Sequence, residues 1–289
     1  MFRARLDEAA RDVGAHLAAL LGGHDDLPVG RAMAYASDGG KRLRAFLVLE
    51  GARLHDVPRS HAIWPAAAIE AVHAFSLVHD DLPCMDDDDL RRGRPTVHVH
   101  WDEATAVLAG DALQALAFEM VLRPECHPDA AVRADLALSL ARASGVEGMV
   151  RGQALDIAAE SAAAPLTLEQ IEALQAGKTG ALFCWSAEAG PRMARADTGP
   201  LRSYAQAMGL AFQIADDILD VEGDAAAAGK RLQKDAEAGK ATFVSLLGLE
   251  AARARATSLV EAACDALAPY GAGAETLREL ARFVIARDR

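Results

Sequence analysis

Apolar residues recur at spacings of three and four through most of the chain, and this period constrains the fold more than any other feature. Alanine and leucine are abundant, and the alternation of apolar and polar residues that strands would show is nearly absent. Glycine and proline interrupt the pattern at points where helices end. The sequence therefore predicts an all-α protein with helices over residues 2–21, 42–55, 60–82, 102–122, 129–160, 167–190, 198–222, 241–268 and 274–287.

The chain shows no shift in composition and no fixed-period repeat that would mark a domain boundary. With 289 residues and 52% hydrophobic content, it is long enough to bury one large core. Long apolar helices with short connections, such as those over residues 60–78 and 204–215, favour a helical bundle. We expect a single domain over residues 1–289, with two central helices presenting acidic ends to one cavity.

Two clusters of aspartates lie at the ends of two predicted helices, each directly after an apolar helical pattern. They are Asp80, Asp81 and Asp86 in the first cluster and Asp216, Asp217 and Asp220 in the second. Such carboxylates repel one another by up to about 4 kcal/mol per close contact, so cations are needed to screen them. Pro83 should end the first helix, so that Asp86 folds back from a loop. Asp216 and Asp220 should share one helical face.

Carboxylates with few histidines nearby are typical of a magnesium site, where water and substrate phosphate complete the coordination. Basic residues, which bind phosphate oxygens, follow a Gly39-Gly40 turn and both acidic clusters. They are Lys41, Arg42 and Arg44 after the turn, Arg91, Arg92 and Arg94 after the first cluster, and Lys230, Arg231, Lys234 and Lys240 after the second. The sequence therefore predicts magnesium and a phosphorylated substrate.

Other interpretations of these residues explain less of the chain. A single acidic run is more often a solvated surface, and Arg91 and Arg92 could simply neutralise the aspartates before them. Glu70 and His73 match the ExxH element of di-iron bundles, but no convincing second copy exists. The His79-Asp80 pair resembles the HD pair of metal-dependent phosphohydrolases, which would leave the second cluster unexplained.

The composition also excludes some classes of protein. A net charge of −12 argues against sequence-independent binding of nucleic acid. The first twenty residues are too charged for a signal peptide, and no apolar run is expected to reach the roughly 18 residues of a membrane span. Four widely spaced cysteines without a CxxC pair indicate reduced thiols. We expect a cytoplasmic protein without stable membrane insertion.

Six motifs, in order along nearly the whole chain, resemble those of the trans-isoprenyl diphosphate synthases, and most closely the bacterial farnesyl diphosphate synthases. Residues 79–96 resemble the first aspartate-rich motif, and residues 213–220 resemble the second. The others are Gly39 to Arg44, Gly152 to Asp156, Lys178 to Leu182, and Gly229-Lys230 with Gly239-Lys240. Two positions depart from the pattern: Ala45 stands where the family commonly has proline, and Arg151 where a smaller residue is expected.

The resemblance implies an isoprenoid synthase fold and condensation of isopentenyl diphosphate with dimethylallyl and then geranyl diphosphate. Asp80, Asp86 and Asp216 would hold a trio of magnesium ions on the allylic diphosphate, supported by Asp81, Asp217 and Asp220. The allylic diphosphate would contact Arg91, Lys178 and Lys240, and isopentenyl diphosphate would contact Lys41, Arg44, His73 and Arg92. Gln213 and Lys230 would close over the allylic site, with Gln213 and Thr179 facing the developing cation.

Product length is predicted from the helix that ends at Asp80. Phe75 lies five residues earlier, about 7 to 8 Å along a helix at 1.5 Å per residue. With the small residues Ala74 and Ser76 beside it, this ring would form a pocket floor, as in family members with an aromatic here, and stop the product at farnesyl diphosphate. Phe75 as an ordinary core residue remains open, as do geranyl and geranylgeranyl products.

Two further classes share part of the pattern. A terpene cyclase would usually replace the second aspartate motif, and a non-catalytic synthase subunit would lose one of the two, whereas both are intact here. The resemblance also implies a homodimer. The segment from Glu222 to Ala241 is expected to be a lid that closes over diphosphate through Lys230 and Lys240.

Overall fold

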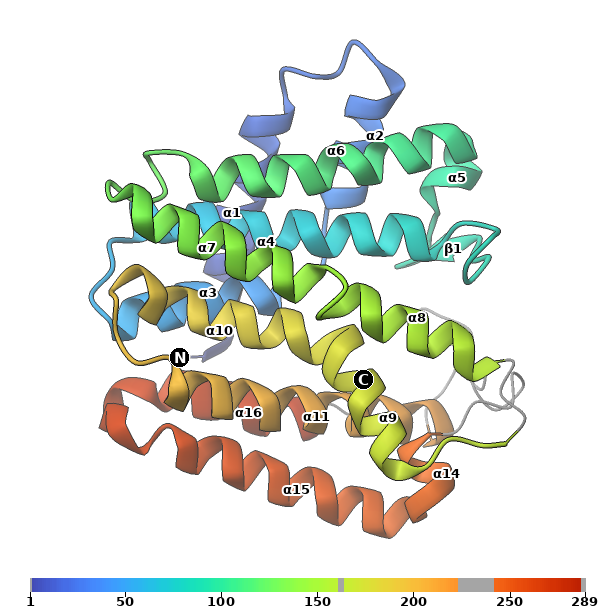
Figure 1. The fold of residues 1–289 in the computed structure, drawn as a ribbon, viewed down its shortest axis with the longest axis vertical. Coiled ribbons are helices and arrows are strands. Elements are labelled where there is room, and N and C mark those ends of the chain that lie inside the picture. Colours follow the sequence, from blue (N-terminus) through green and yellow to red (C-terminus); the bar gives the residue numbers. More distant parts are fainter. Residues whose placement is uncertain (1, 161–163, 223–241, 287–289) are drawn as a thin grey trace. The chain divides into compact units, whose positions relative to one another are not determined.

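The computed structural model describes residues 2–160, 164–222 and 242–286. The predicted all-α class is confirmed (Figure 1): these residues form helices and turns, apart from a small hairpin in which β1 (Leu90–Arg91) pairs with β2 (Arg94–Pro95). The chain divides into two compact units, unit 1 with residues 1–140 and 188–196, and unit 2 with residues 141–187 and 197–289.

Unit 1 is built around a long central helix, α4, which packs against α1, α2, α3 and α6. The helices of this unit are α1 (Phe2–Leu21), α2 (Pro28–Ser37), α3 (Leu43–Leu54), α4 (Arg59–Asp80), α5 (Val97–His100), α6 (Glu103–Leu122) and most of α7 (Ala130–Ser144). An alanine-rich stretch of α4, residues 66–68, is fully buried, because small side chains let neighbouring helices approach closely. The acidic end of α4 is thereby held on a rigid core helix.

Unit 2 is organised around α11, which packs against α15 and α16 (Figure 1). Its elements are α8 (Met149–Glu160), α9 (Leu168–Gln175), a π-helical turn η1 (Ala176–Gly180), the first part of α10 (Ala181–Met193), α11 (Gly199–Glu222), α14 (Phe243–Leu247), α15 (Leu249–Ala266), a 3-10 turn η2 (Ala268–Ala274) and α16 (Glu275–Ile285). The fully buried Tyr204 ties α11 to α16, because its hydroxyl donates to the Leu277 carbonyl at 2.8 Å.

Several helices differ from the sequence expectation. The predicted helix 129–160 is two helices separated by a turn between Gly145 and Gly148. The helix expected over 167–190 contains the π-helical turn η1, and the one over 241–268 breaks at Gly248, whose φ of +79° suits glycine. Helices α2 and α5 and the hairpin were not predicted, because each is too short to show more than two or three turns of a periodic pattern.

Two helices of unit 1, α4 and α6, are long and apolar enough to cross a membrane by length and composition alone. The expectation that no apolar run reaches that length was therefore wrong. In α4, 72% of the apolar window is buried within the protein, as in a core helix, and in α6 the share is 44%. Core helices pass the same test, so two such helices are weak evidence for a membrane protein.

Candidate active site

The first aspartate cluster lies where α4 ends. The helix stops at Asp80, and the chain turns back so that the Asp86 N–H donates to the Asp80 carbonyl at 2.8 Å. The Asp88 N–H likewise donates to the Asp81 carbonyl at 3.2 Å. The predicted construction, a helix end with Asp86 folding back after Pro83, is confirmed. Asp80 and Asp86 are only half-buried, so they can be reached by ligands.

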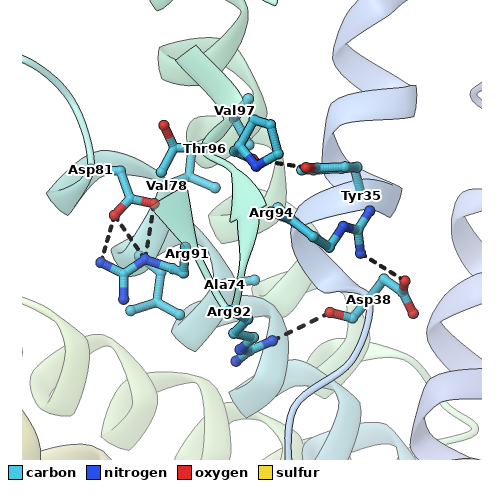
Figure 2. Close-up of a pocket in the computed structure, with 13 residues that line it drawn as sticks. Tyr35, Asp38, Ala74, Val78, Asp81, Arg91, Arg92, Arg94, Thr96 and Val97 are labelled. Atoms are coloured by element: carbon cyan, nitrogen blue, oxygen red, sulfur yellow. Dashed lines mark hydrogen bonds and ion pairs between the residues drawn. The ribbon is translucent and has the colours of Figure 1, made fainter. Parts of the chain in front are cut away.

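Asp81 differs from its neighbour Asp80, because it is only 3% exposed and is bound by Arg91. The Arg91 Nε and Nη2 atoms donate to Asp81 Oδ1 at 2.7 and 2.5 Å (Figure 2). Burial raises the pKa of Asp81, and the bonds from Arg91 offset this only in part. Burial would lower the pKa of Arg91, but the bonds and charge of Asp81 outweigh it and raise that pKa. Asp81 therefore anchors the hairpin to α4.

The predicted binding residues for isopentenyl diphosphate within unit 1 gather beside this loop. The Arg92 guanidinium lies against Gly40, where a β-carbon would come within 2.9 Å of Arg92 Cζ, and Gly40 has a φ of +82°. The positive φ favours glycine here, and the missing β-carbon leaves room for the guanidinium in the position seen. Burial lowers the pKa of Arg44 and of Arg92; the charge of Arg92 lowers the pKa of Arg44 further, and the charges of Arg91 and Arg42 lower that of Arg92. The exposed Lys41 follows Gly40 directly, so the turn and the hairpin bring these cations together.

His73 lies among the same cations, one turn along α4 from Glu70. Burial lowers the pKa of His73 well below its usual range, and the positive charges of Arg44, Arg92, Arg91 and Arg42 lower it further. The imidazole is therefore neutral at neutral pH. A phosphate group with two or three negative charges, bound here, would offset the positive charge of these arginines. It would therefore raise the pKa of His73 and favour its protonation.

This pKa predicts a pH dependence of stability. Unfolded His73 titrates near 6.5 while folded His73 stays neutral, so the unfolded state binds more protons below that pH. Stability should fall as pH drops below about 6.5, by up to about 1.4 kcal/mol per pH unit from this group. His73→Gln should flatten the fall in melting temperature between about pH 7 and pH 5, as thermal unfolding followed by circular dichroism would show. An unchanged slope would contradict the neutral imidazole.

A small pocket separates the hairpin from α2 and α4 (Figure 2). Tyr35 donates its hydroxyl to the Pro95 carbonyl at 2.8 Å, and the Arg94 guanidinium covers the Tyr35 ring at 3.9 Å. Arg94 also pairs with Asp38 at 3.0 Å, and the Asp38 carbonyl accepts from Arg92 at 3.3 Å. The pocket encloses about 50 Å³, which suits a few water molecules and not a prenyl chain. The side chains that line it instead connect the hairpin to α2 and to Asp38, the residue after α2, through the contacts of Tyr35 and Arg94.

The predicted product-length residues lie on α4 below Asp80. Phe75 is 6% exposed, and its ring meets the His79 ring edge-on, with centroids 5.9 Å apart. The His79 Nε2 atom lies 3.1 Å from the Val107 carbonyl of α6, in a notch where a β-carbon on Gly110 would come within 2.1 Å of it. Ser76 is half-buried and donates to the His73 carbonyl at 2.9 Å. Phe75 therefore lies on the side of α4 that carries His79, and its role as a pocket floor stays a prediction.

The second aspartate cluster lies within one turn of α11, in unit 2. Gln213, Asp216 and Asp220 repeat at three and four residues, so they share a face of the helix, and all are half-buried. Asp217 points to another partner, since its Oδ2 accepts the Phe243 N–H at 2.7 Å, at the start of α14. The second aspartate of each pair thus has a structural bond, Asp81 with Arg91 and Asp217 with α14.

The predicted residues Lys178 and Thr179 lie in the π-helical turn η1, a kind of turn that is frequent at functional sites. Lys178 Nζ donates to Asp156 Oδ2 at 2.6 Å, and both side chains are largely buried. Helix α8 approaches this turn at Gly152, where a β-carbon would come within 1.9 Å of the Lys178 nitrogen. The family motifs at Gly152 and Lys178 are therefore two sides of one backbone contact.

The remaining predicted site residues, Lys230 and Lys240, lie outside the described residues, as does the expected lid except for its first residue, Glu222. Sequence reasoning missed the roles of Tyr35, Asp38 and Gly110, because none of them belongs to a motif or charge cluster recognised in the sequence. It named Glu70 only in the di-iron alternative, although that carboxylate lies among the predicted phosphate-binding cations.

The described parts of the chain contain no group of three or more His, Cys, Asp or Glu side chains that could hold a metal ion by themselves. Magnesium does not require such a cage, since it is usually bound through one or two carboxylates plus water and substrate phosphate. Asp80 and Asp86 at the end of α4 provide one pair of such carboxylates in unit 1, and Asp216 and Asp220 on one turn of α11 provide another in unit 2. These residues fit magnesium bound together with a phosphorylated substrate.

A helical fold with two aspartate motifs and a set of buried cations defines a class of enzymes that handle diphosphate esters. The chain belongs to the polyprenyl synthetase family, whose profile matches residues 28–268. It is 45% identical to the farnesyl diphosphate synthase of Escherichia coli strain K12, covering 91% of this chain and 90% of that protein. It is 42% identical to the farnesyl diphosphate synthase of Geobacillus stearothermophilus, covering 89% and 88%.

Solved structures show the same fold. An FPP/GFPP synthase from Zymomonas mobilis, solved in the apo form, matches with a TM-score of 0.90 and 45% identity, covering 98% of each chain. A geranylgeranyl pyrophosphate synthetase from Pyrococcus horikoshii matches with a TM-score of 0.90 and 31% identity, covering 99% of this chain and 98% of that one. Solved relatives with this fold are thus named as synthases of products that differ in length.

Proposed function

We propose that this enzyme condenses isopentenyl diphosphate with dimethylallyl and then geranyl diphosphate to give farnesyl diphosphate. The observation that supports the proposal is that unit 1 contains two chemically different groups of side chains, each suited to a phosphate group. One has the accessible carboxylates Asp80 and Asp86, which suit a metal-bound diphosphate. The other has Arg44, His73 and Arg92 without an accessible carboxylate cluster, which suits a diphosphate bound by cations alone.

The two sites imply a division of labour in the reaction. Asp80, Asp86 and Asp216 would hold magnesium, which supplies positive charge to the departing allylic diphosphate. Arg91 and Lys178, together with Lys240, would bind the same diphosphate, and contacts that strengthen as its charge develops lower the barrier to the allylic cation. Arg44, His73 and Arg92 would orient isopentenyl diphosphate, whose double bond attacks that cation. The released diphosphate would accept the proton that is then lost.

A homodimer is part of the proposal, and the outer face of α6 supports it. This helix is among the most apolar of the chain, yet Val107, Leu108 and Leu122 are 41%, 53% and 48% exposed. An apolar face of this kind is usually covered by a partner. We also propose that the enzyme is cytoplasmic and binds no nucleic acid, in accord with its net charge of −12. Sedimentation velocity should show the mass of two chains.

The test of the function is to incubate the protein with isopentenyl and dimethylallyl diphosphates and to identify products by mass. A fifteen-carbon diphosphate should form with magnesium and should not form with excess EDTA. A cyclic hydrocarbon would instead indicate a terpene cyclase, and binding of both diphosphates without turnover would indicate a non-catalytic subunit. Either result would overturn the proposal.

Phe75 is proposed to limit product length. Phe75→Ala should shift the main product from fifteen carbons to twenty or more, because loss of the ring opens space beneath Asp80. The matched control is Phe46→Ala, which removes another buried ring of unit 1, one that packs edge-on against Phe2 at 5.7 Å. Both variants should lose stability, but only the first should lengthen the product. Equal product lengths would show that Phe75 is an ordinary core residue.

A further inference from the structure

Glu70 is a buried carboxylate for which the reaction described above has no role. It lies in the middle of α4 and is 7% exposed. Its Oε1 accepts the backbone N–H of Ala45 at 3.0 Å. Ala45 is the third residue of α3, which begins at Leu43, so this N–H is one of the first four of the helix and has no acceptor within it. Glu70 therefore closes the start of α3 from a neighbouring helix.

The same carboxylate is the counter-charge of the isopentenyl diphosphate site. Burial lowers the pKa of Arg44, and the negative charge of Glu70 acts in the opposite direction. Burial likewise lowers the pKa of Arg92, and Glu70 is the strongest opposing charge there, ahead of Asp38. One buried glutamate thus lies close to two cations that come from different elements, the start of α3 and the hairpin. Its charge offsets part of the repulsion that Arg44 and Arg92 each feel from neighbouring arginines.

Ala45 makes this arrangement possible in the present chain. Proline has no N–H, so a proline at this position, as is common in the family that the sequence resembles, could not donate to Glu70. Proline is tolerated in the first turn of a helix, because the N–H groups there have no intrahelical acceptor. Ala45 therefore supplies a bond that holds the carboxylate and the helix start bearing Arg44 in one position.

We propose that Glu70, held by the Ala45 N–H, is a positioning residue that orients Arg44 and Arg92 for the diphosphate of the homoallylic substrate before that substrate binds. The assignment rests on the proposed function. It gives the glutamate of the Glu70-x-x-His73 pair an electrostatic role and does not make it a metal ligand. A buried negative charge also explains how Arg44 and Arg92 can lie together in a partly buried site in the enzyme without its trianionic substrate.

The experiment compares Glu70→Gln with Glu50→Gln in the full-length protein. Glutamine at position 70 keeps the size of the side chain and an oxygen that can accept the Ala45 N–H, but it loses the charge. Glu50 is a matched control, because it is 3% exposed, lies on α3, and is paired with Arg5 at 2.5 Å and Arg53 at 3.0 Å, none of which belongs to the site. Initial rates are measured against each substrate, and thermal unfolding is followed by circular dichroism.

Glu70→Gln should raise the KM for isopentenyl diphosphate about tenfold, the size expected when a charge-assisted contact is weakened, with little change in kcat or in the KM for geranyl diphosphate. Ala45→Pro should change the same KM in the same direction by a smaller factor, since it removes only the anchoring bond. Glu50→Gln should lower the melting temperature without this split.

An unchanged or lowered KM for isopentenyl diphosphate in Glu70→Gln would overturn the positioning role, and a lowered value would mark Glu70 as an opposing charge. Equal increases for both substrates would overturn it as well, because they would indicate a general distortion. In these cases the unsubstituted enzyme still makes product and the proposed function stands. Absence of product from the unsubstituted protein would overturn the function and this assignment together.

Discussion

Replacing Asp80 with asparagine should lower kcat/KM by about 10³- to 10⁴-fold, while the helical content and the melting temperature stay near those of the unsubstituted protein. Asparagine keeps the shape of the side chain but removes the charge that binds a hard divalent cation. A loss of several kcal/mol of transition-state stabilisation corresponds to this range, because each 1.4 kcal/mol is tenfold in rate. Steady-state rates with saturating magnesium measure it.

The neighbouring residue provides the control. Asp81→Asn removes the negative charge that Arg91 is paired with. The Arg91 side chain is 32% exposed, and the Asp81 side chain is 4% exposed. Breaking a buried pair from one side costs about 3 to 5 kcal/mol, and the partial exposure of Arg91 reduces this to roughly 2 kcal/mol. Asp81→Asn should therefore destabilise the protein more than Asp80→Asn does. If Asp80→Asn retains activity within about tenfold, the metal role of Asp80 is wrong.

Gly152→Ala should both destabilise the protein, by about 3 kcal/mol, and lower kcat/KM by about 10²-fold. The added methyl group would come within 1.9 Å of the Lys178 nitrogen and 2.5 Å of its α-carbon. These are backbone atoms, so no rotation of a side chain relieves the overlap, and η1 has to move away from α8. Because η1 carries Lys178 and Thr179, a shift of about 1 Å is enough to misplace them.

Gly23→Ala is the matched substitution, because a β-carbon at Gly23 would meet nothing within 4 Å. We expect its stability and rates to stay within experimental error of the unsubstituted protein. Urea unfolding and steady-state kinetics of the two variants can be run side by side. If Gly152→Ala behaves like Gly23→Ala, the close approach of α8 to η1 is not a feature of the folded enzyme.

The parts of the fold that the sequence predicted well are the long core helices. Helix α4 is long and apolar on most of its faces and α11 carries a clear apolar period, and both ends that carry aspartates were placed within two residues, at Asp80 and Glu222. The apolar period does not predict elements that consist of only a few residues. Helix α2 has ten residues and begins at a proline, so its short pattern is not distinguishable from a turn.

The candidate site was predicted by residue type but not by orientation. Sequence spacing gathers Asp80 and Asp81, or Asp216 and Asp217, into one cluster, although successive residues of a helix point about 100° apart. Whether a carboxylate faces solvent or a partner depends on what lies beside the helix, namely Arg91 for Asp81 and the Phe243 N–H for Asp217. Glu70 shows the same limit, because its partner Ala45 is an unremarkable residue whose backbone matters.

We propose that the two aspartate clusters bind metal ions on one diphosphate. The most direct measurement is a crystal structure with manganese, inorganic pyrophosphate and isopentenyl diphosphate, in which anomalous scattering locates the metal. We expect metal within about 2.3 Å of carboxylate oxygens of Asp80, Asp86 and Asp216, in contact with pyrophosphate. Metal bound to one cluster only, or pyrophosphate bound without metal, would contradict it.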